Sequence, residues 1–285
     1  MTPLCNLQRT VATFRRAARS WMLVPVLSSA LFGCGDKVGP PVDTALAVRN
    51  TGWGSNVTIT FGDGNFRFRS NGIPNHALQA EYVMPDNFTS CVPHPTPKCT
   101  HVEPVAMAIQ TSSLDFTIPA MPQKLTETFS LPFGAMGVII SGSTVYNPYE
   151  GDGTTVAMNA NFTIPNQKGQ PVAFMDSCNG HPSPHPAGQY HYHGLPSCVT
   201  AQVDQKDGPS HIIGYAFDGF PVYGDRDING QPVKPESLDE CNGIESPTPE
   251  FPNSIYHYVM LEVPTVQSTI RCLSLIHISE PTRPY

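Results

Sequence analysis

Charged side chains are scarce in this sequence, at 14% of its 285 residues, and basic ones are scarcer than acidic ones. Between Cys34 and Cys272 there are 11 basic and 22 acidic residues, a formal net charge of −11. This balance excludes the electrostatic footprint of a nucleic-acid-binding protein, and no basic patch suits an anionic lipid surface. Walker, dinucleotide-binding and Gly-x-Ser-x-Gly patterns are also missing, so nothing indicates nucleotide-dependent chemistry. Any charged partner should be cationic, and metal ions fit this requirement.

Long helical patterns are missing too, because no segment keeps an apolar period of 3.6 residues for long. Proline (30) and glycine (23) are abundant, which is typical of a turn-rich β protein. Apolar and polar residues alternate around Asp63-Gly64-Asn65, which predicts a β-hairpin over residues 57–69. Further strands are expected over residues 105–109, 114–118, 137–140, 172–175, 211–217 and 255–261. The best helix candidate, Pro235 to Cys241, is a turn or two long, so the sequence predicts an all-β, sandwich-like domain with long loops.

The N-terminus has the order of residues found in a secretory signal. A basic segment without acidic residues precedes an apolar run from Trp21 to Phe32, which is too short for a comfortable transmembrane helix. Leu31-Phe32-Gly33-Cys34 resembles a bacterial lipobox, which predicts cleavage before Cys34, lipidation of its thiol and a membrane anchor in the cell envelope. The alternative is an ordinary cleaved signal and a secreted protein. Residues 1–33 are thus expected to be a signal peptide, residues 34–50 a tether, and residues 51–272 the β domain.

The other end of the chain differs in composition from everything before it. Residues 273–285 resemble the translation of synthetic sequencing-adapter DNA. We therefore expect a non-native tail after Cys272 and leave His277 out of every candidate site.

Six cysteines remain once Cys5 of the signal and Cys34 are set aside, and an even number in an exported chain predicts three disulfides. Fifteen pairings are possible. Order along the chain favours Cys91–Cys99, Cys178–Cys198 and Cys241–Cys272. A Cys-rich zinc site is the alternative, but no Cys-x-x-Cys spacing supports it.

The densest concentration of candidate ligands is the run Tyr190-His191-Tyr192-His193, enclosed by Cys178 and Cys198. In a β-strand, residues two apart share a face, so both imidazoles should lie on one face and both phenols on the other. His181 and His185 lie just upstream, in a stretch rich in proline that is expected to be a loop. Two histidines in this arrangement can present two nitrogens to one metal ion.

An imperfect internal repeat surrounds this run. Cys178-Asn179-Gly180 leads to Tyr-His-Tyr and then Cys198, and Cys241-Asn242-Gly243 leads to Tyr256-His257-Tyr258 and then Cys272. A duplicated unit often places its copies about a twofold axis. We therefore hypothesise that His257 lies near His191 and His193.

Five motifs, in order, carry a resemblance to a known family. They are Gly72-Ile73-Pro74-Asn75-His76, Gly180-His181, Gly188 to His193, Ile213 to Gly224 and Leu238 to Gly243. Together they resemble the YHYH domain family of secreted proteins, over residues 72–272. This resemblance implies a shared fold and little established biochemistry. Ile244 and Val259 stand where the family pattern has histidines in the second copy, so a single, asymmetric site is expected.

The candidate site is centred on His191 and His193, with further ligands drawn from His181, His257 or His76. Zinc and copper(II) suit such imidazole-rich sets, and an open position would permit hydrolysis of an ester or amide. For that reaction the candidate bases are Asp218 and Glu240, and the candidate hydrogen-bond donors are Tyr190 and Tyr223.

The alternative function is a non-catalytic module that binds surface glycans or a protein partner. Its aromatic strands would form the contact face, and its histidines would hold the fold together.

Overall fold

The structure, a computed structural model, describes residues 39–76, 89–90, 100–101, 109–130, 134–149, 153–158, 163–165, 171–173, 175–176, 178–184 and 187–274. All the described residues belong to the unit Cys34–Tyr285. Among those residues, no helix has both the length and the apolar character that a membrane span needs.

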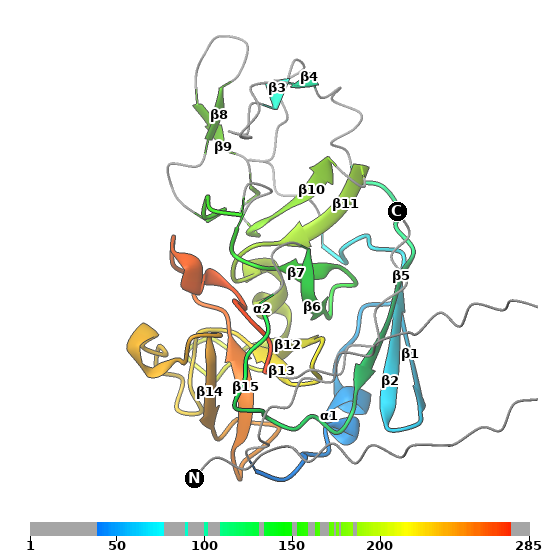
Figure 1. Cartoon of the computed structure of the whole chain (residues 1–285), viewed down its shortest axis with the longest axis vertical. Helices are drawn as coiled ribbons and strands as arrows, with labels where there is room; N and C mark the ends of the chain where they lie inside the picture. Colours follow the sequence, from blue (N-terminus) through cyan, green and yellow to red (C-terminus); the bar gives the residue numbers. More distant parts are fainter. Residues whose placement is uncertain are drawn as a thin grey trace, which may run out of the picture. The chain divides into compact units, whose positions relative to one another are not determined.

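The described chain has a mostly β fold, as predicted, because its strands hold far more residues than its helices, and it contains two principal sheets (Figure 1). The strands are β1 Val57–Gly62, β2 Asn65–Ser70, β3 Thr89–Ser90, β4 Thr100–His101, β5 Leu114–Pro119, β6 Ala135–Ile139, β7 Thr144–Tyr146, β8 Thr163–Pro165, β9 Pro171–Ala173, β10 Gly180–Pro184, β11 Ala187–Tyr192, β12 Ile212–Ala216, β13 Pro221–Tyr223, β14 Gly243–Ser246 and β15 Ile255–Val259. The helical segments are α1 Ala45–Asn50, α2 Ser197–Val203 and the 3-10 turns η2 Pro235–Ser237 and η3 Val266–Ser268.

The predicted hairpin is confirmed as β1 and β2, and the strands predicted near β5, β6, β9, β12 and β15 are confirmed as well. Most of the predicted strand at 105–109 lies outside the described residues. The predicted helix at 235–241 is reduced to η2. The Pro-rich loop predicted around His181 is wrong, because this segment is strand β10. β10 is an edge strand, where Pro182 is tolerated although it lacks an N–H.

The smaller sheet, in the order β1-β2-β5, is antiparallel and turns its aromatic side chains toward the larger one. Phe66 and Phe68 alternate with the exposed Arg67 along β2. The rings of Phe66 and Trp53 lie 5.4 and 5.8 Å from the ring of Tyr215 on β12. These contacts join the two sheets through one apolar core.

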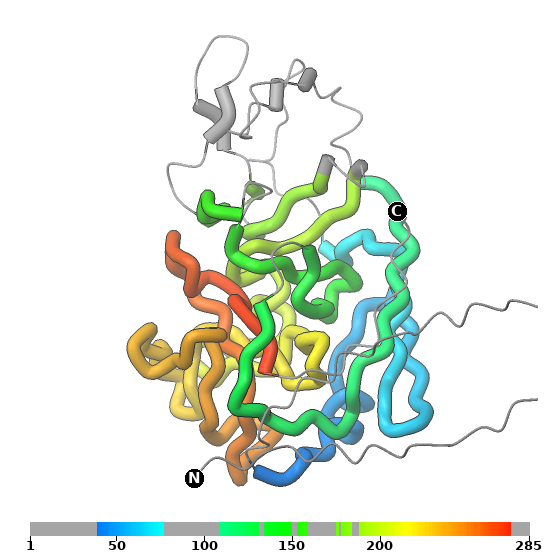
Figure 2. The backbone as a smooth tube through the Cα atoms, viewed as in Figure 1, coloured from blue at the N-terminus to red at the C-terminus, as the bar shows by residue number. Residues whose placement is uncertain are grey.

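The larger sheet has eight strands in the order β10-β11-β7-β6-β12-β13-β15-β14. Read inward from either edge, the pairings are antiparallel, parallel and antiparallel. The first four strands come from the green stretch of the chain and the last four from the yellow and orange stretch (Figure 2). The sheet therefore consists of two consecutive copies of one four-stranded unit, which confirms the internal repeat.

The two copies meet where β6 pairs with β12. Gly137 and Gly214 are equivalent because each pairs with a valine of the next strand, Val145 and Val222. Across the junction Gly137 pairs with Ala216, Gly214 with Ile139, and Val138 with Tyr215. An approximate twofold axis therefore passes by the last pair. A Cβ atom on either glycine would collide with a carbonyl of the facing strand, so the junction requires glycine at both positions.

One carboxylate organises the loop of each copy. Asp176 accepts hydrogen bonds from the backbone N–H of Cys178 (2.9 Å) and Gly180 (3.1 Å), and from the Tyr190 hydroxyl (2.7 Å). Asn179, between the two bonded amides, has a φ of 62°, a conformation that asparagine tolerates. The repeated motif is thus Asp-x-Cys-Asn-Gly, two residues longer than the sequence comparison indicated.

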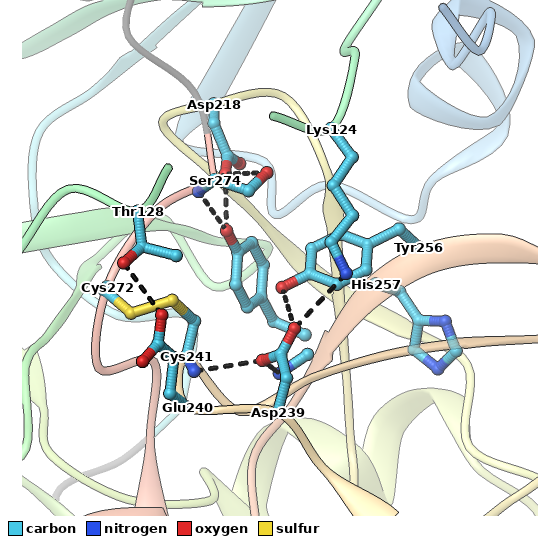
Figure 3. Close-up of polar contacts among 12 residues, drawn as sticks. Lys124, Thr128, Asp218, Asp239, Glu240, Cys241, Tyr256, His257, Cys272 and Ser274 are labelled. Carbon is cyan, nitrogen blue, oxygen red and sulfur yellow. Dashed lines mark hydrogen bonds and ion pairs between the residues drawn. A yellow bond between two sulfur atoms is a disulfide. The ribbon is translucent and has the colours of Figure 1, made fainter. Parts of the chain in front are cut away.

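The second copy reproduces these bonds. Asp239 accepts from the N–H of Cys241 (3.0 Å) and Gly243 (2.8 Å) and from the Tyr256 hydroxyl (2.9 Å). Figure 3 shows this group together with Lys124, whose Nζ lies 3.4 Å from Asp239. The same loop is therefore built twice from the same three polar contacts at equal spacing.

Two of the three predicted disulfides are confirmed. Cys178 is bonded to Cys198 and Cys241 to Cys272, with Cα atoms 5.4 and 4.6 Å apart. Cys91 and Cys99 lie outside the described residues, and so does Cys34. Disulfides persist in oxidising compartments, which indicates an extracytoplasmic protein.

The folded part is longer at both ends than the sequence predicts. Val48 of α1 is fully buried and Thr44 donates to the carbonyl of Ala120, so the end of the expected tether belongs to the domain. At the other end, Leu273 and Ser274 are buried although the sequence analysis placed them in the tail. The rest of the predicted tail, residues 275–285, lies outside the described residues.

The second tyrosine of each Tyr-His-Tyr run bonds a residue just past the central strand pair. Tyr192 is 2.8 Å from Ser141 Oγ, and its equivalent Tyr258 donates a 2.5 Å hydrogen bond to Asp218. The N–H of Ser274 donates to the same carboxylate, as Figure 3 shows. Complete burial raises the pKa of Asp218 to about 6.

We predict that Asp218→Asn removes a pH-dependent part of the stability. Because the pKa of Asp218 is raised above its ordinary 3.8, the folded state holds this proton more tightly than the unfolded state. Asp218 therefore contributes stability below about pH 4 that is lost as the pH rises through 6. The free energy of unfolding of the native protein should exceed that of the variant by about 2 kcal/mol less at pH 7 than at pH 4. Denaturant titrations at both pH values check this, and a difference that is independent of pH would contradict it.

Candidate metal centre

Three histidines meet on one face of the β10–β11 edge of the large sheet. Alternation along β11 puts His191 and His193 on the same face, and the pairing of β10 places His181 directly opposite His191. The ring centroids are 4.4 Å apart for His181 and His191, 4.8 Å for His191 and His193, and 5.2 Å for His181 and His193. All three are buried, and one ring nitrogen of each lies within 4.8 Å of the others.

Backbone carbonyls fix the tautomer of each imidazole. Nδ1 of His181 lies 3.1 Å from Pro182 O, Nδ1 of His191 lies 3.1 Å from Gln189 O, and Nδ1 of His193 lies 2.8 Å from Asn147 O. A carbonyl can only accept, so each Nδ1 carries the proton and each Nε2 of a neutral ring keeps its lone pair. The Nε2 atoms of His191 and His193 are 3.0 Å apart. Two lone pairs at this distance favour a cation between them.

Burial keeps the three rings neutral. It lowers the pKa of His181 and of His191 well below the usual 6.5, and the neighbouring histidines add to the effect. It also lowers the pKa of His193 to about 4. Neutral imidazole is the form that binds a metal, so no proton has to be displaced from these rings at neutral pH.

Tyr146 forms one wall of the cluster. Its ring stacks on His191 with centroids 3.9 Å apart and meets His193 edge-on at 5.8 Å. Burial raises the pKa of Tyr146 to about 12, so the phenol is neutral. Sequence reasoning missed this residue, although the repeat holds its signal: Val145-Tyr146 is equivalent to Val222-Tyr223 at the same strand position.

His76, a predicted ligand, lies on the opposite face of β11. Its Nε2 is 2.7 Å from the Tyr192 hydroxyl and 3.6 Å from Cys178 Sγ. Because Tyr192 and the two histidines of the run point to opposite faces, His76 belongs to the tyrosine side. This contradicts its place in the predicted ligand set.

The hypothesis that His257 lies beside His191 is wrong. β15, which carries His257, is separated from β11 by β7, β6, β12 and β13. The twofold axis is present, but it passes between β6 and β12 and sends equivalent residues toward opposite edges. His257 instead packs edge-on against Tyr223, with ring centroids 4.9 Å apart.

The four predicted catalytic side chains form bonds elsewhere in the domain. Tyr190 donates to Asp176 on the tyrosine face, and Asp218 accepts from Tyr258. Glu240 is exposed and accepts a hydrogen bond from Thr128 (Figure 3), while Tyr223 donates to Glu250. No contact found in the described part of the chain joins any of the four to the histidine cluster.

The predicted aromatic contact face is also wrong. The four tyrosines of the two Tyr-His-Tyr runs are all buried, with at most 4% of their surface exposed. They are Tyr190, Tyr192, Tyr256 and Tyr258. Their role is internal, because their hydroxyl groups bond Asp176, Ser141, Asp239 and Asp218.

The donor set itself fits a transition metal. Three neutral imidazole nitrogens, each oriented by a carbonyl on its other nitrogen, match the ligands and the outer shell of zinc and copper sites. The geometry therefore could hold one metal ion, with room in the coordination sphere for a further ligand.

Comparison with known proteins finds one family that matches part of the chain. Residues 115–232, from β5 to just beyond β13, match the YHYH protein family. No curated protein and no solved structure matches the chain. The match covers all three clustered histidines and the Asp218 turn but ends before the second Tyr-His-Tyr run. Residues 115–232 of this chain are therefore similar to the YHYH protein family.

Proposed function

We propose that this extracytoplasmic protein binds one transition-metal ion, zinc or copper, through the Nε2 atoms of His181, His191 and His193. The comparison of the two halves of the large sheet carries this proposal. It distinguishes the residues that the fold requires from those that only metal binding would require.

The second copy has the same loop and strand pair, which we call the frame, with different side chains at the equivalent positions. Val259 stands in the place of His193, and its N–H donates to Asn242 O at 2.9 Å just as that of His193 donates to Asn179 O at 2.9 Å. Ile244 stands in the place of His181, because it pairs with His257 as His181 pairs with His191. Isoleucine and valine satisfy the frame there.

Two of the three histidines, His181 and His193, are therefore not required to form this loop and strand. Apolar residues at these buried positions are less costly than imidazoles, since burial opposes any charge on the ring. A structural role alone gives no reason to gather three ring nitrogens in the first copy. Metal binding supplies one, and it also explains why the adjacent atoms of His191 and His193 are the Nε2 atoms that the carbonyls leave unprotonated.

A hydrolase reaction has little support from the positions of the residues expected to carry it. Its candidate bases, Asp218 and Glu240, bond Tyr258 and Thr128 respectively. The proposal is metal binding, which serves either metal handling or chemistry at the ion.

We predict that His191→Ala with His193→Ala abolishes metal binding. Protein purified without a His tag and loaded with zinc should hold one ion per chain, and the double variant should hold less than a tenth of that. At 100 times the dissociation constant, zinc should stabilise the native protein by about 2.7 kcal/mol and leave the variant unchanged. Elemental analysis and thermal unfolding measure the two quantities.

His257→Ala is the matched control, because His257 is the equivalent of His191 in the second copy. It should keep one zinc ion per chain. Absence of stoichiometric zinc, copper and iron from the native protein, with a melting temperature that chelator leaves unchanged, would contradict the proposal and favour a purely structural role.

We also propose that the mature chain begins at Cys34 and is held at the bacterial cell envelope by lipid on that cysteine. The support is the sequence Leu31-Phe32-Gly33-Cys34 after a basic and apolar leader. Mass spectrometry of the mature N-terminal peptide should show a diacylglycerol-modified Cys34. An unmodified N-terminus at another residue would contradict the anchor and favour a secreted protein.

A further inference from the structure

A buried hydroxyl lies beside the histidine cluster and takes no part in the frame. Thr144 of β7 pairs with His191 of β11 in the parallel register. Paired residues of neighbouring strands point to the same face, so Thr144 lies on the histidine side. Tyr146, two residues further along β7, confirms this, because it stacks on His191.

The hydroxyl of Thr144 is unusual in its surroundings. The residue is fully buried, and Oγ1 makes no hydrogen bond with any group in the described part of the chain. Buried hydroxyl groups normally have a partner, and those that do not are often part of a binding site. In the second copy the equivalent position is Pro221, which has no hydroxyl at all.

Thr144, His191 and His181 form one row across β7, β11 and β10. We propose that the Thr144 hydroxyl hydrogen-bonds the fourth, non-protein ligand of the ion held by the three histidines, a water molecule or a small anion. The inference rests on the proposed metal binding. Three protein nitrogens leave a zinc ion one tetrahedral position, and that position takes water or another small ligand in open sites.

The chemistry of the hydroxyl suits this role. A threonine can accept a hydrogen bond from a water molecule or donate one to an anion without becoming charged. Its branched side chain has few rotamers on a strand, so the hydroxyl is held in place. The resulting site favours small ligands in which a hydrogen-bond donor or acceptor lies next to the atom that binds the metal.

The test uses Thr144→Val, which removes the hydroxyl and keeps the shape. Native protein and variant are loaded with cobalt(II), whose visible spectrum reports its ligands, and titrated with azide as the probe anion. Azide should bind the variant about tenfold more weakly, the effect of one hydrogen bond. Thr144→Ser, which keeps the hydroxyl, should restore most of the affinity, and Thr60→Val on the exposed face of β1 should change nothing.

Two further measurements separate this inference from the metal proposal. Zinc stoichiometry should stay at one per chain in Thr144→Val, and the metal-free variant should melt at the same temperature as the native protein or higher, because valine leaves no hydroxyl unpaired. Equal azide affinity in native protein and variant, or no azide binding to the native cobalt protein, would overturn the role of Thr144. Absence of metal from the native protein would overturn the proposed function instead.

Discussion

The alternation of side chains along β11 is the constraint on which both the fold and the site depend. It sends Tyr190 and Tyr192 to one face, where their hydroxyl groups meet Asp176 and Ser141. It sends His191 to the other face, together with His193 just beyond the strand. The tyrosine bonds hold the strand in register with the loop at Asp176, and that register decides where the imidazoles lie. A slip of one residue would exchange the two sets.

Duplication shows which parts of this arrangement belong to the frame. Both copies keep the Asp-x-Cys-Asn-Gly loop, the first tyrosine bonded to its carboxylate and a disulfide from the loop cysteine. Only the first copy adds the other two histidines and Thr144. The second copy has isoleucine, valine and proline in their places, and its remaining histidine packs against Tyr223. One frame has thus been used for a candidate metal centre at one edge of the sheet and for apolar packing at the other.

Local pattern was sufficient to predict the pair at the centre of the site. Tyrosine and histidine alternate in the Tyr-His-Tyr-His run, and residues two apart on a strand share a face. The shared face of His191 and His193 could therefore be predicted from the sequence. The position of His181 depends on the pairing of β10 with β11. The prolines of β10 are typical of a loop. They are tolerated in a strand only at the edge of a sheet, and the sequence alone does not show that β10 is an edge strand. Thr144 carries no local signal, since only the parallel pairing of β7 with β11 brings it to the site.

The repeat could be recognised from the sequence, but the position of its axis could not. A twofold axis between the two strands that carry the Tyr-His-Tyr runs would have placed their histidines side by side. The close approach at Gly137 and Gly214 sets the axis between β6 and β12, so the copies face outward to opposite edges. The same limit applies to Asp218, whose turn was evident while its bond to Tyr258 was not.

Anomalous diffraction from a crystal of the zinc-loaded protein tests the central claim most directly. Data collected on either side of the zinc absorption edge locate the ion without any assumption about its ligands. The account predicts one peak, about 2.0–2.1 Å from the Nε2 atoms of His181, His191 and His193. No peak between these three nitrogens, or a principal peak at His257 or His76, would contradict it.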